Sequence, residues 1–188
     1  VNVDGTATTS ELIKSFESST EKKILHKLVK HIIPGVHLKL YEINAQEDIV
    51  DLNHELAKEV ADRLGENADA VKTDVSKSDD VENMIATALK GFSKIDILVQ
   101  NAAIGMKPKS LVDTSEELFN NLFNINVKSV YLGARAVIPI FKQQNNGGVI
   151  LNTVSTAALR PRPGLTIYNA SKGALVPMTK ALALELAD

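Results

Sequence analysis

From residue 49 onward, the sequence predicts an α/β fold with a mainly parallel sheet. Short apolar runs alternate there with stretches of helical period, which is the pattern of repeated βα units. The run at residues 95–99 is apolar almost throughout, as expected for a strand that is covered on both faces. We therefore divide the 188 residues into an atypical N-terminal segment, residues 1–48, and a core region, residues 49–188.

Composition narrows the classes of function. Hydrophobic residues make up 44% and charged residues 23%, which is typical of a soluble globular protein. The net charge of -2 offers no basic field for nucleic acid, and no apolar run is long enough to span a membrane. The chain has no cysteine, and its four histidines lack metal-ligand spacing, so we expect no metal site. Without a signal-peptide pattern, we expect a cytoplasmic location.

The first half of the core region predicts two strands, each followed by a helix. The strand candidates are residues 49–52 and 70–73. Asn53 can cap the first helix, and Gly65 supplies a C-terminal stop. Both helices carry one apolar face, made by Leu56, Ala57, Val60, Ala61 and Leu64 in the first and by Val81, Met84, Ile85, Ala88 and Leu89 in the second.

The second half predicts a long helix, a buried strand and a last helix. Thr114 and Glu117 form a capping box, which predicts a helix from there to about Phe141. Residues 149–151 predict another buried strand. Residues 160–164 form a proline-rich, rigid loop, and the last helix runs from there to the end of the sequence.

Residues 1–48 predict a helix and then a strand. Ser18 and Glu21 resemble a capping box, and a helical apolar face follows, made by Ile24, Leu25, Leu28, Val29, Ile32 and Ile33. Residues 36–41 alternate between apolar and polar and predict a strand. Too few residues separate this strand from residue 49 for a parallel crossover, so the two strands are antiparallel neighbours or unrelated.

Tyr168 and Lys172 share one face of the last helix, a turn apart. When hydride leaves or reaches a carbon, the attached oxygen must lose or gain a proton. A phenol can supply that proton, and a nearby ammonium favours its phenolate form. Because a tyrosine and a lysine at this spacing also occur by chance, the pair alone is a weak signal.

Polar residues near the carboxyl ends of the predicted strands strengthen that signal. Ser155 follows the strand that begins at residue 149, where parallel sheets place their ligand crevice. Its hydroxyl could donate a hydrogen bond to a developing alkoxide. Asn126 falls inside the long helix, where asparagine is an unfavourable choice. Residues 101–105 follow another strand and are small enough for a flat ring to approach the backbone.

Over about residues 49–188, the sequence resembles the short-chain dehydrogenase/reductase family. The matching segments occur in the family's order: IVDLN, KTDVS, DILVQNAAIG, INVKSV, ILNTVS and YNASK. The resemblance implies a Rossmann-like, doubly wound sheet and an NAD(P)-dependent oxidoreductase that interconverts a secondary alcohol and a carbonyl. The sequence is similar to 3-oxoacyl-carrier-protein reductases and sugar dehydrogenases, which implies a small-molecule substrate and a homo-oligomer, dimeric or tetrameric.

The resemblance also implies roles for single residues. Tyr168 would be the acid/base, Lys172 would support it and hold the nicotinamide ribose, Ser155 would polarise the substrate oxygen, and Asn126 would anchor a water. The implied cofactor-binding residues are Asp51, Asp74, Val75, Asn101, Ala102, Ala103 and Gly105, together with Tyr168 and Lys172. A carboxylate at Asp51 would bind the adenine ribose and repel a 2′-phosphate, which favours NAD over NADP. Glu42 is a rival for that role.

The sequence departs from the family pattern in three places. Residues 1–48 contain only Gly5 and Gly35, so the family's glycine-rich turn is missing, and we expect the first βα unit with its central strand to be lacking. The family's C-terminal strands would lie beyond residue 188. Gln100 and Ala103 replace the usual asparagine and glycine.

Two further interpretations follow from the resemblance. The alternative to an enzyme is a non-catalytic fragment that acts only by helix-mediated association. In the family, the long helix and the last helix form the subunit interface, where Leu132, Ala136 and Ile140 could drive pairing. Arg160 and Arg162 lie near the expected substrate entrance, where they could favour an anionic substrate or simply be solvated.

Overall fold

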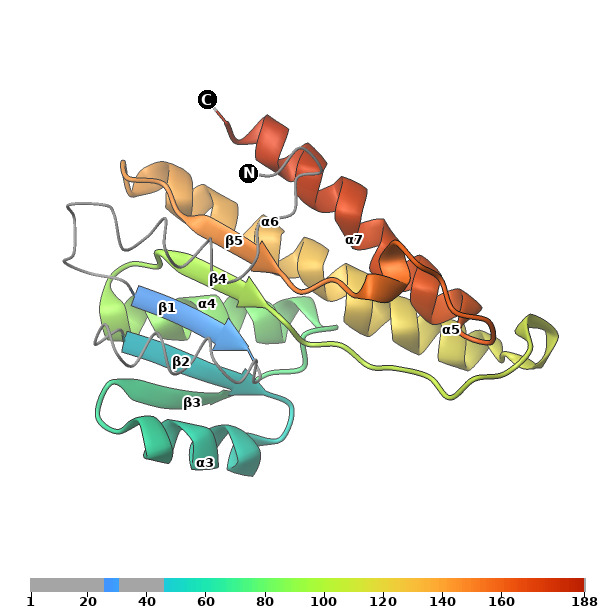
Figure 1. Ribbon diagram of the computed structural model, residues 1–188. Helices are drawn as coiled ribbons and strands as arrows, with labels where there is room; N and C mark the ends of the chain where they lie inside the picture. Colours follow the sequence, from blue (N-terminus) through green and yellow to red (C-terminus); the bar gives the residue numbers. More distant parts are fainter. Residues whose placement is uncertain (1–25, 31–45, 188) are drawn as a thin grey trace.

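The computed structural model describes residues 26–30 and 46–187, which form a parallel five-stranded sheet with helices on both faces (Figure 1). The strands are β1 (His26–Lys30), β2 (Gln46–Asp51), β3 (Ala68–Lys72), β4 (Ile97–Gln100) and β5 (Val149–Asn152). Their order is β3-β2-β1-β4-β5, and every pairing is parallel. The direction of winding reverses between β1 and β4, as in a doubly wound Rossmann-like sheet. The predicted fold class is therefore confirmed.

Strand β1 corrects the interpretation of the N-terminal segment. The helical period predicts a helix through these residues, but they form the central strand, with Val29 opposite both Ile49 of β2 and Val99 of β4. Short apolar runs fit a helix and a buried strand alike, and here ladders on both sides decide the outcome. The central strand that we expected to be lacking is thus present. The predicted cap at Ser18, the predicted strand at residues 36–41 and Glu42 lie outside the described residues.

Helices α3 (His54–Leu64) and α4 (Ser78–Phe92) follow β2 and β3 as predicted. Asn53 caps α3, because its Oδ1 accepts hydrogen bonds from the backbone N–H groups of Glu55 and Leu56, at 3.1 and 3.3 Å. Gly65 ends the helix at a φ of 81°, a left-handed conformation that favours glycine.

The predicted long helix is divided into three parts. It begins with α5 (Glu116–Phe123), continues as a π-helical segment (Asn124–Lys128) and ends with α6 (Ser129–Gln143). Its N-cap is Ser115, and the predicted capping box of Thr114 and Glu117 is wrong. Thr114 already ends a preceding 3-10 turn (Leu111–Asp113), where its hydroxyl donates to the carbonyl of Ser110 at 3.0 Å. The Ser115 hydroxyl is therefore the one that accepts from the N–H of Leu118, at 3.2 Å.

After β5, a 3-10 turn (Thr156–Ala158) leads through the proline-rich loop to α7 (Thr166–Glu185). No helix within residues 46–187 is long and apolar enough to cross a membrane.

The two faces of the sheet are packed by different helices. Successive residues of β2 point to opposite faces, so that Ile49 packs with α3 while Val50 packs with α4 and α6. On the second face, Leu132 is 5% exposed, and Ala136 and Ile140 pack against the same core. These three residues therefore contribute to the chain's own core, and their role in subunit pairing stays a prediction.

One carboxyl group in the sheet is buried without full hydrogen bonding. Asp48 of β2 is 2% exposed, and its Oδ2 has no hydrogen-bond partner. Burial, together with the charge of Asp69 opposite it on β3, raises the pKa of Asp48 to about 7. The unfolded chain, with an ordinary aspartate pKa, releases this proton at lower pH than the folded chain. Ionisation of Asp48 therefore opposes folding. The free energy of unfolding decreases as the pH rises from about 4 to about 7, because the protonated carboxyl group is the form that the folded chain favours.

We predict that Asp48→Asn stabilises the protein at pH 8 but changes little at pH 4. The expected gain at pH 8 is at most about 4 kcal/mol in the free energy of unfolding, measured by urea denaturation. Asp62→Asn is the control, because Asp62 is exposed and its ion pair with Lys58 lies at the surface. Equal gains for Asp48→Asn at both pH values would contradict the assignment.

Candidate active site

Asn126 joins three segments that are far apart in the sequence. It lies in the π-helical segment and is 1% exposed. Its Oδ1 accepts from the N–H of Ile104 at 2.8 Å, and its Nδ2 donates to the carbonyl of Ile104 at 3.0 Å. Nδ2 also donates to the Ser171 hydroxyl at 3.0 Å. Asn126 therefore ties the loop after β4 to helix α7, and π-helical segments often occur at functional sites.

Ser171 passes this connection on to Tyr168. The Ser171 side chain is fully buried, and its hydroxyl donates to the backbone carbonyl of Tyr168 at 2.8 Å. Tyr168 is half-buried in the first turn of α7. Sequence reasoning did not single out Ser171, although it stands next to Lys172 in the YNASK segment. A hydroxyl in the middle of an otherwise apolar helix face was the available signal.

Lys172 lies one turn after Tyr168 and is bound to the end of strand β5. The residue is 3% exposed, and its Nζ donates to the carbonyl of Thr153 at 2.9 Å. Burial lowers the pKa of the Lys172 ammonium. Because the cation is costly to hold in this environment, a phenolate or a polar ligand group nearby would stabilise it.

Ser155 is placed two residues beyond the carbonyl that binds Lys172. It begins the 3-10 turn after β5, and its hydroxyl oxygen accepts from the N–H of Ala157 at 3.2 Å. This turn packs directly against α7. The structure therefore brings the segments of Asn126, Ser155, Tyr168 and Lys172 together at the carboxyl ends of β4 and β5.

Most predicted cofactor-binding residues lie along the same edge of the sheet. Asp51 ends β2, where its Oδ1 accepts from the N–H of Asn53 at 2.8 Å. Val75 and Ala102 line one small cavity of about 20 Å³. Asn101 and Ala102 are half-buried after β4, and Ala103 and Gly105 are exposed.

These positions are suited to a dinucleotide. The winding reverses between β1 and β4, and a ligand crevice is expected outside the carboxyl ends of the strands at such a point. Beside Gly105, a side-chain carbon would meet no atom within 4 Å, so the segment that could hold the nicotinamide half has open space. Asp51 stands at the other end of this edge, within the part expected to hold the adenine ribose.

Asp74 uses its side chain within its own turn. The Ser76 hydroxyl and N–H donate to its Oδ1 at 2.7 and 3.0 Å, and they hold the pKa of Asp74 below its usual value. Lys77 lies 3.6 Å from the other carboxylate oxygen. The carboxylate thus shapes the loop that carries Val75, and a contact between Asp74 and adenine remains a prediction.

Gln100 is a second connecting residue that sequence reasoning undervalued. Its Nε2 donates to the carbonyl of Val130 at 3.2 Å and to Oδ1 of Asn152 at 3.1 Å. Asn152 in turn donates to Thr179 of α7 at 2.9 Å. A side-chain carbon at Gly133 would lie 2.3 Å from Gln100 Oε1, so the glycine makes room for the longer amide.

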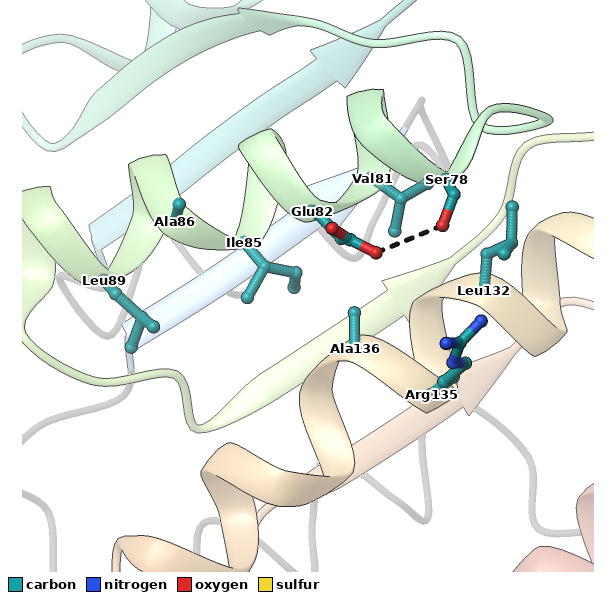
Figure 2. A pocket seen from close by; sticks show the side chains of 9 residues that line it. All are labelled: Ser78, Val81, Glu82, Ile85, Ala86, Leu89, Leu132, Arg135 and Ala136. Atoms are coloured by element: carbon teal, nitrogen blue, oxygen red, sulfur yellow. Dashed lines mark hydrogen bonds between the residues drawn. The ribbon is translucent and has the colours of Figure 1, made fainter.

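A wider groove of about 270 Å³ lies elsewhere, between α4 and α6 (Figure 2). Its walls are mainly apolar, with Glu82 and Arg135 on opposite helices. No predicted catalytic or cofactor-binding residue lines it. The groove is therefore separate from the candidate active site.

Comparison with known proteins agrees with this arrangement. The family model for short chain dehydrogenase matches residues 36–188. The chain belongs to the short-chain dehydrogenase family. It is 38% identical over 142 residues to 3beta-hydroxysteroid dehydrogenase 2 of Eggerthella lenta, covering 73% of this chain and 54% of that protein. It is 43% identical to human dehydrogenase/reductase SDR family member 4 over 113 residues, which is 60% of this chain and 40% of the relative.

Solved structures of the family share the fold. A 3-ketoacyl-(acyl-carrier-protein) reductase from Brucella melitensis, complexed with NADH, is 40% identical with a TM-score of 0.79, over 88% of this chain and 72% of that one. A short chain dehydrogenase/reductase from Burkholderia phymatum, in complex with NAD, is 29% identical with a TM-score of 0.81. The match covers 90% of this chain and 62% of that one. The chain spans about half the length of the curated relatives it matches, 54% of the Eggerthella lenta protein and 40% of the human one.

We predict that Ser171→Ala destabilises the protein by about 1–3 kcal/mol, because it leaves an amide hydrogen of buried Asn126 without a partner. The measurement is the free energy of unfolding in urea. Ser78→Ala is the matched control: the Ser78 hydroxyl bonds Glu82 at the surface, and its loss should change stability by less than about 0.5 kcal/mol. Equal effects of the two variants would refute a special role for the buried hydroxyl.

Proposed function

We propose that this chain carries the catalytic site of an NAD(P)-dependent oxidoreductase that interconverts a secondary alcohol and a carbonyl. The observation that carries the proposal is the connection from Ile104 through Asn126 and Ser171 to the turn of Tyr168. It joins the segment suited to the nicotinamide with the predicted acid/base. Family membership and the NADH and NAD complexes of the two similar structures support the same chemistry.

Each predicted catalytic residue has a role that its surroundings support. The bound nicotinamide would accept or supply the hydride. The Tyr168 hydroxyl exchanges the proton of the substrate oxygen, and the Lys172 ammonium favours its phenolate form. The Ser155 hydroxyl donates a hydrogen bond to the substrate oxygen as its negative charge develops. Asn126 holds the loop after β4 in place and, as in the family, anchors a water of the proton relay.

We propose NAD as the cofactor, with NADP second. Asp51 supports this choice, because a carboxylate at the end of β2 can accept hydrogen bonds from the ribose hydroxyls and would repel a 2′-phosphate. Asp74, Val75 and residues 101–105 complete the proposed binding site.

The substrate, the assembly and the location are proposed at a coarser level. Relatives of this chain are named for substrates as different as a hydroxysteroid and 4-formylbenzenesulfonate, so we propose only a small molecule with an alcohol or carbonyl group. A homo-oligomer is proposed from the family resemblance, and the exposed Tyr131 on α6 and Leu184 on α7 are apolar surface that a second copy could cover. A cytoplasmic location is proposed from the sequence analysis alone.

We predict saturable binding of NADH at micromolar concentration, followed by the fluorescence of the cofactor. NADPH should bind more weakly, because its 2′-phosphate would face Asp51. No binding of either cofactor up to millimolar concentration would favour the alternative, a chain that acts only by association.

We further predict that Tyr168→Phe lowers kcat at least about 100-fold while NADH binding is nearly unchanged, because only the acid/base hydroxyl is removed. Tyr131→Phe is the matched control, since Tyr131 is an exposed tyrosine on α6. Turnover should be measured with a panel of small ketones and NADH. Similar kcat values for Tyr168→Phe and the unaltered chain would exclude the role given to that phenol.

A further inference from the structure

Two loops meet at the edge of the candidate active site, one after β4 and one after β5 (Figure 1). The N–H of Lys109 donates to the carbonyl of Gly164 at 3.0 Å. Gly164 has a φ of 75°, and a side-chain carbon there would lie 3.1 Å from Pro108. The close contact therefore needs glycine, and it fixes the two loops against each other.

The paired loops carry positive charge without acidic partners. The first loop contributes Lys107 and Lys109, and the second contributes Arg160 and Arg162. All four are exposed. Residues 101–110 and 155–165 contain no acidic residue, although the chain as a whole has a net charge of -2. Within the part of the chain that the structure describes, none of the four forms an ion pair; Lys109 Nζ donates to the backbone carbonyl of Asp113 at 3.2 Å.

The loop with the arginines is held rigidly between two predicted catalytic residues. It runs from the turn of Ser155 to the helix of Tyr168, and it contains Pro161 and Pro163, whose rings fix φ. The carbonyl of Arg162 accepts from Nδ2 of Asn169, the residue after Tyr168, at 2.9 Å. The N–H of Arg160 donates to Thr156 at 2.8 Å. Little backbone entropy would be lost when a ligand engages these side chains.

We propose that Arg160 and Arg162, assisted by the lysines of the facing loop, bind an anionic group of the substrate. The proposal rests on the proposed function, because it assigns a substrate class to that same site: an alcohol or carbonyl compound that also carries a carboxylate, sulfonate or phosphate. A guanidinium matches the geometry of such groups and forms paired, charge-assisted hydrogen bonds with them. Asp113, Glu116 and Glu117 are the nearest acidic residues after the first loop, and none forms an ion pair with the four cations among the described residues.

The test compares two ketones that differ only in charge, 4-acetylbenzoate and 4-acetylbenzamide. Their binding to the full chain is measured by titration calorimetry at low salt, with and without NADH. We expect the carboxylate to bind at least roughly tenfold more tightly than the amide, a difference of about 1.4 kcal/mol. In the double variant Arg160→Gln with Arg162→Gln, this preference should fall most of the way to equal binding, because only the lysines remain. Arg63→Gln, which replaces an exposed arginine on α3, should keep the preference.

Replacing both arginines with lysine separates geometry from charge. Arg160→Lys with Arg162→Lys should keep part of the preference for the carboxylate. The positive charge remains, but an ammonium cannot form the paired hydrogen bonds of a planar guanidinium. Equal binding of the two ketones, no binding of 4-acetylbenzoate at millimolar concentration, or an undiminished preference in the glutamine variant would each overturn the proposal.

The outcomes also separate this proposal from the proposed function. If 4-acetylbenzoate is preferred but neither ketone is reduced with NADH, the anion site stands and the oxidoreductase function fails. If both ketones are reduced with the same KM, the function stands and the anion site fails. Folding of each variant is checked by its urea unfolding curve, and the exposure of all substituted side chains makes unchanged stability the expected result.

Discussion

The carboxamide of Asn126 is the interaction on which the candidate site depends. Its oxygen and nitrogen make three hydrogen bonds in a buried position, two to the backbone of Ile104 and one to Ser171. In the interior such a group must be fully satisfied, or it costs about 1–3 kcal/mol. The loop after β4, the π-helical segment and α7 can therefore hold only one relative position while this amide is paired. A buried polar contact thus organises the candidate site.

The sequence predicts those parts of the fold that are determined by nearby residues. Asn53 and Gly65 define α3 correctly, because a cap and a left-handed glycine act over a single turn. The misassigned capping residue, Thr114 in place of Ser115, reflects a preceding turn that sequence spacing does not reveal. Strand β1 could not be predicted from its own residues, because its identity comes from ladders with β2 and β4, one of them formed far along the chain.

The candidate site was predicted as a set of segments, and the structure adds the bonds between them. Tyr168 and Lys172 follow from helical spacing, and Asn126 stood out as an unfavourable residue for a helix. The sequence does not single out Ser171 and marks Gln100 only as a departure from the family pattern, because their partners, Asn126 and Asn152, lie 45 and 52 residues away. Hydrogen bonds of that sequence separation leave no local pattern.

The π-helical segment has a consequence for how this stretch of chain can change by insertion or deletion. A π-turn accommodates one residue more than an α-turn, so it behaves as a single-residue insertion that a continuous helix has absorbed. Deleting one residue from Asn124–Lys128 could restore a regular helix without breaking the chain's path. The deletion would leave α6 in its present orientation, with Leu132 and Val137 still in the core, but it would remove the wide turn that carries Asn126. The length of this segment is thus as constrained as its composition.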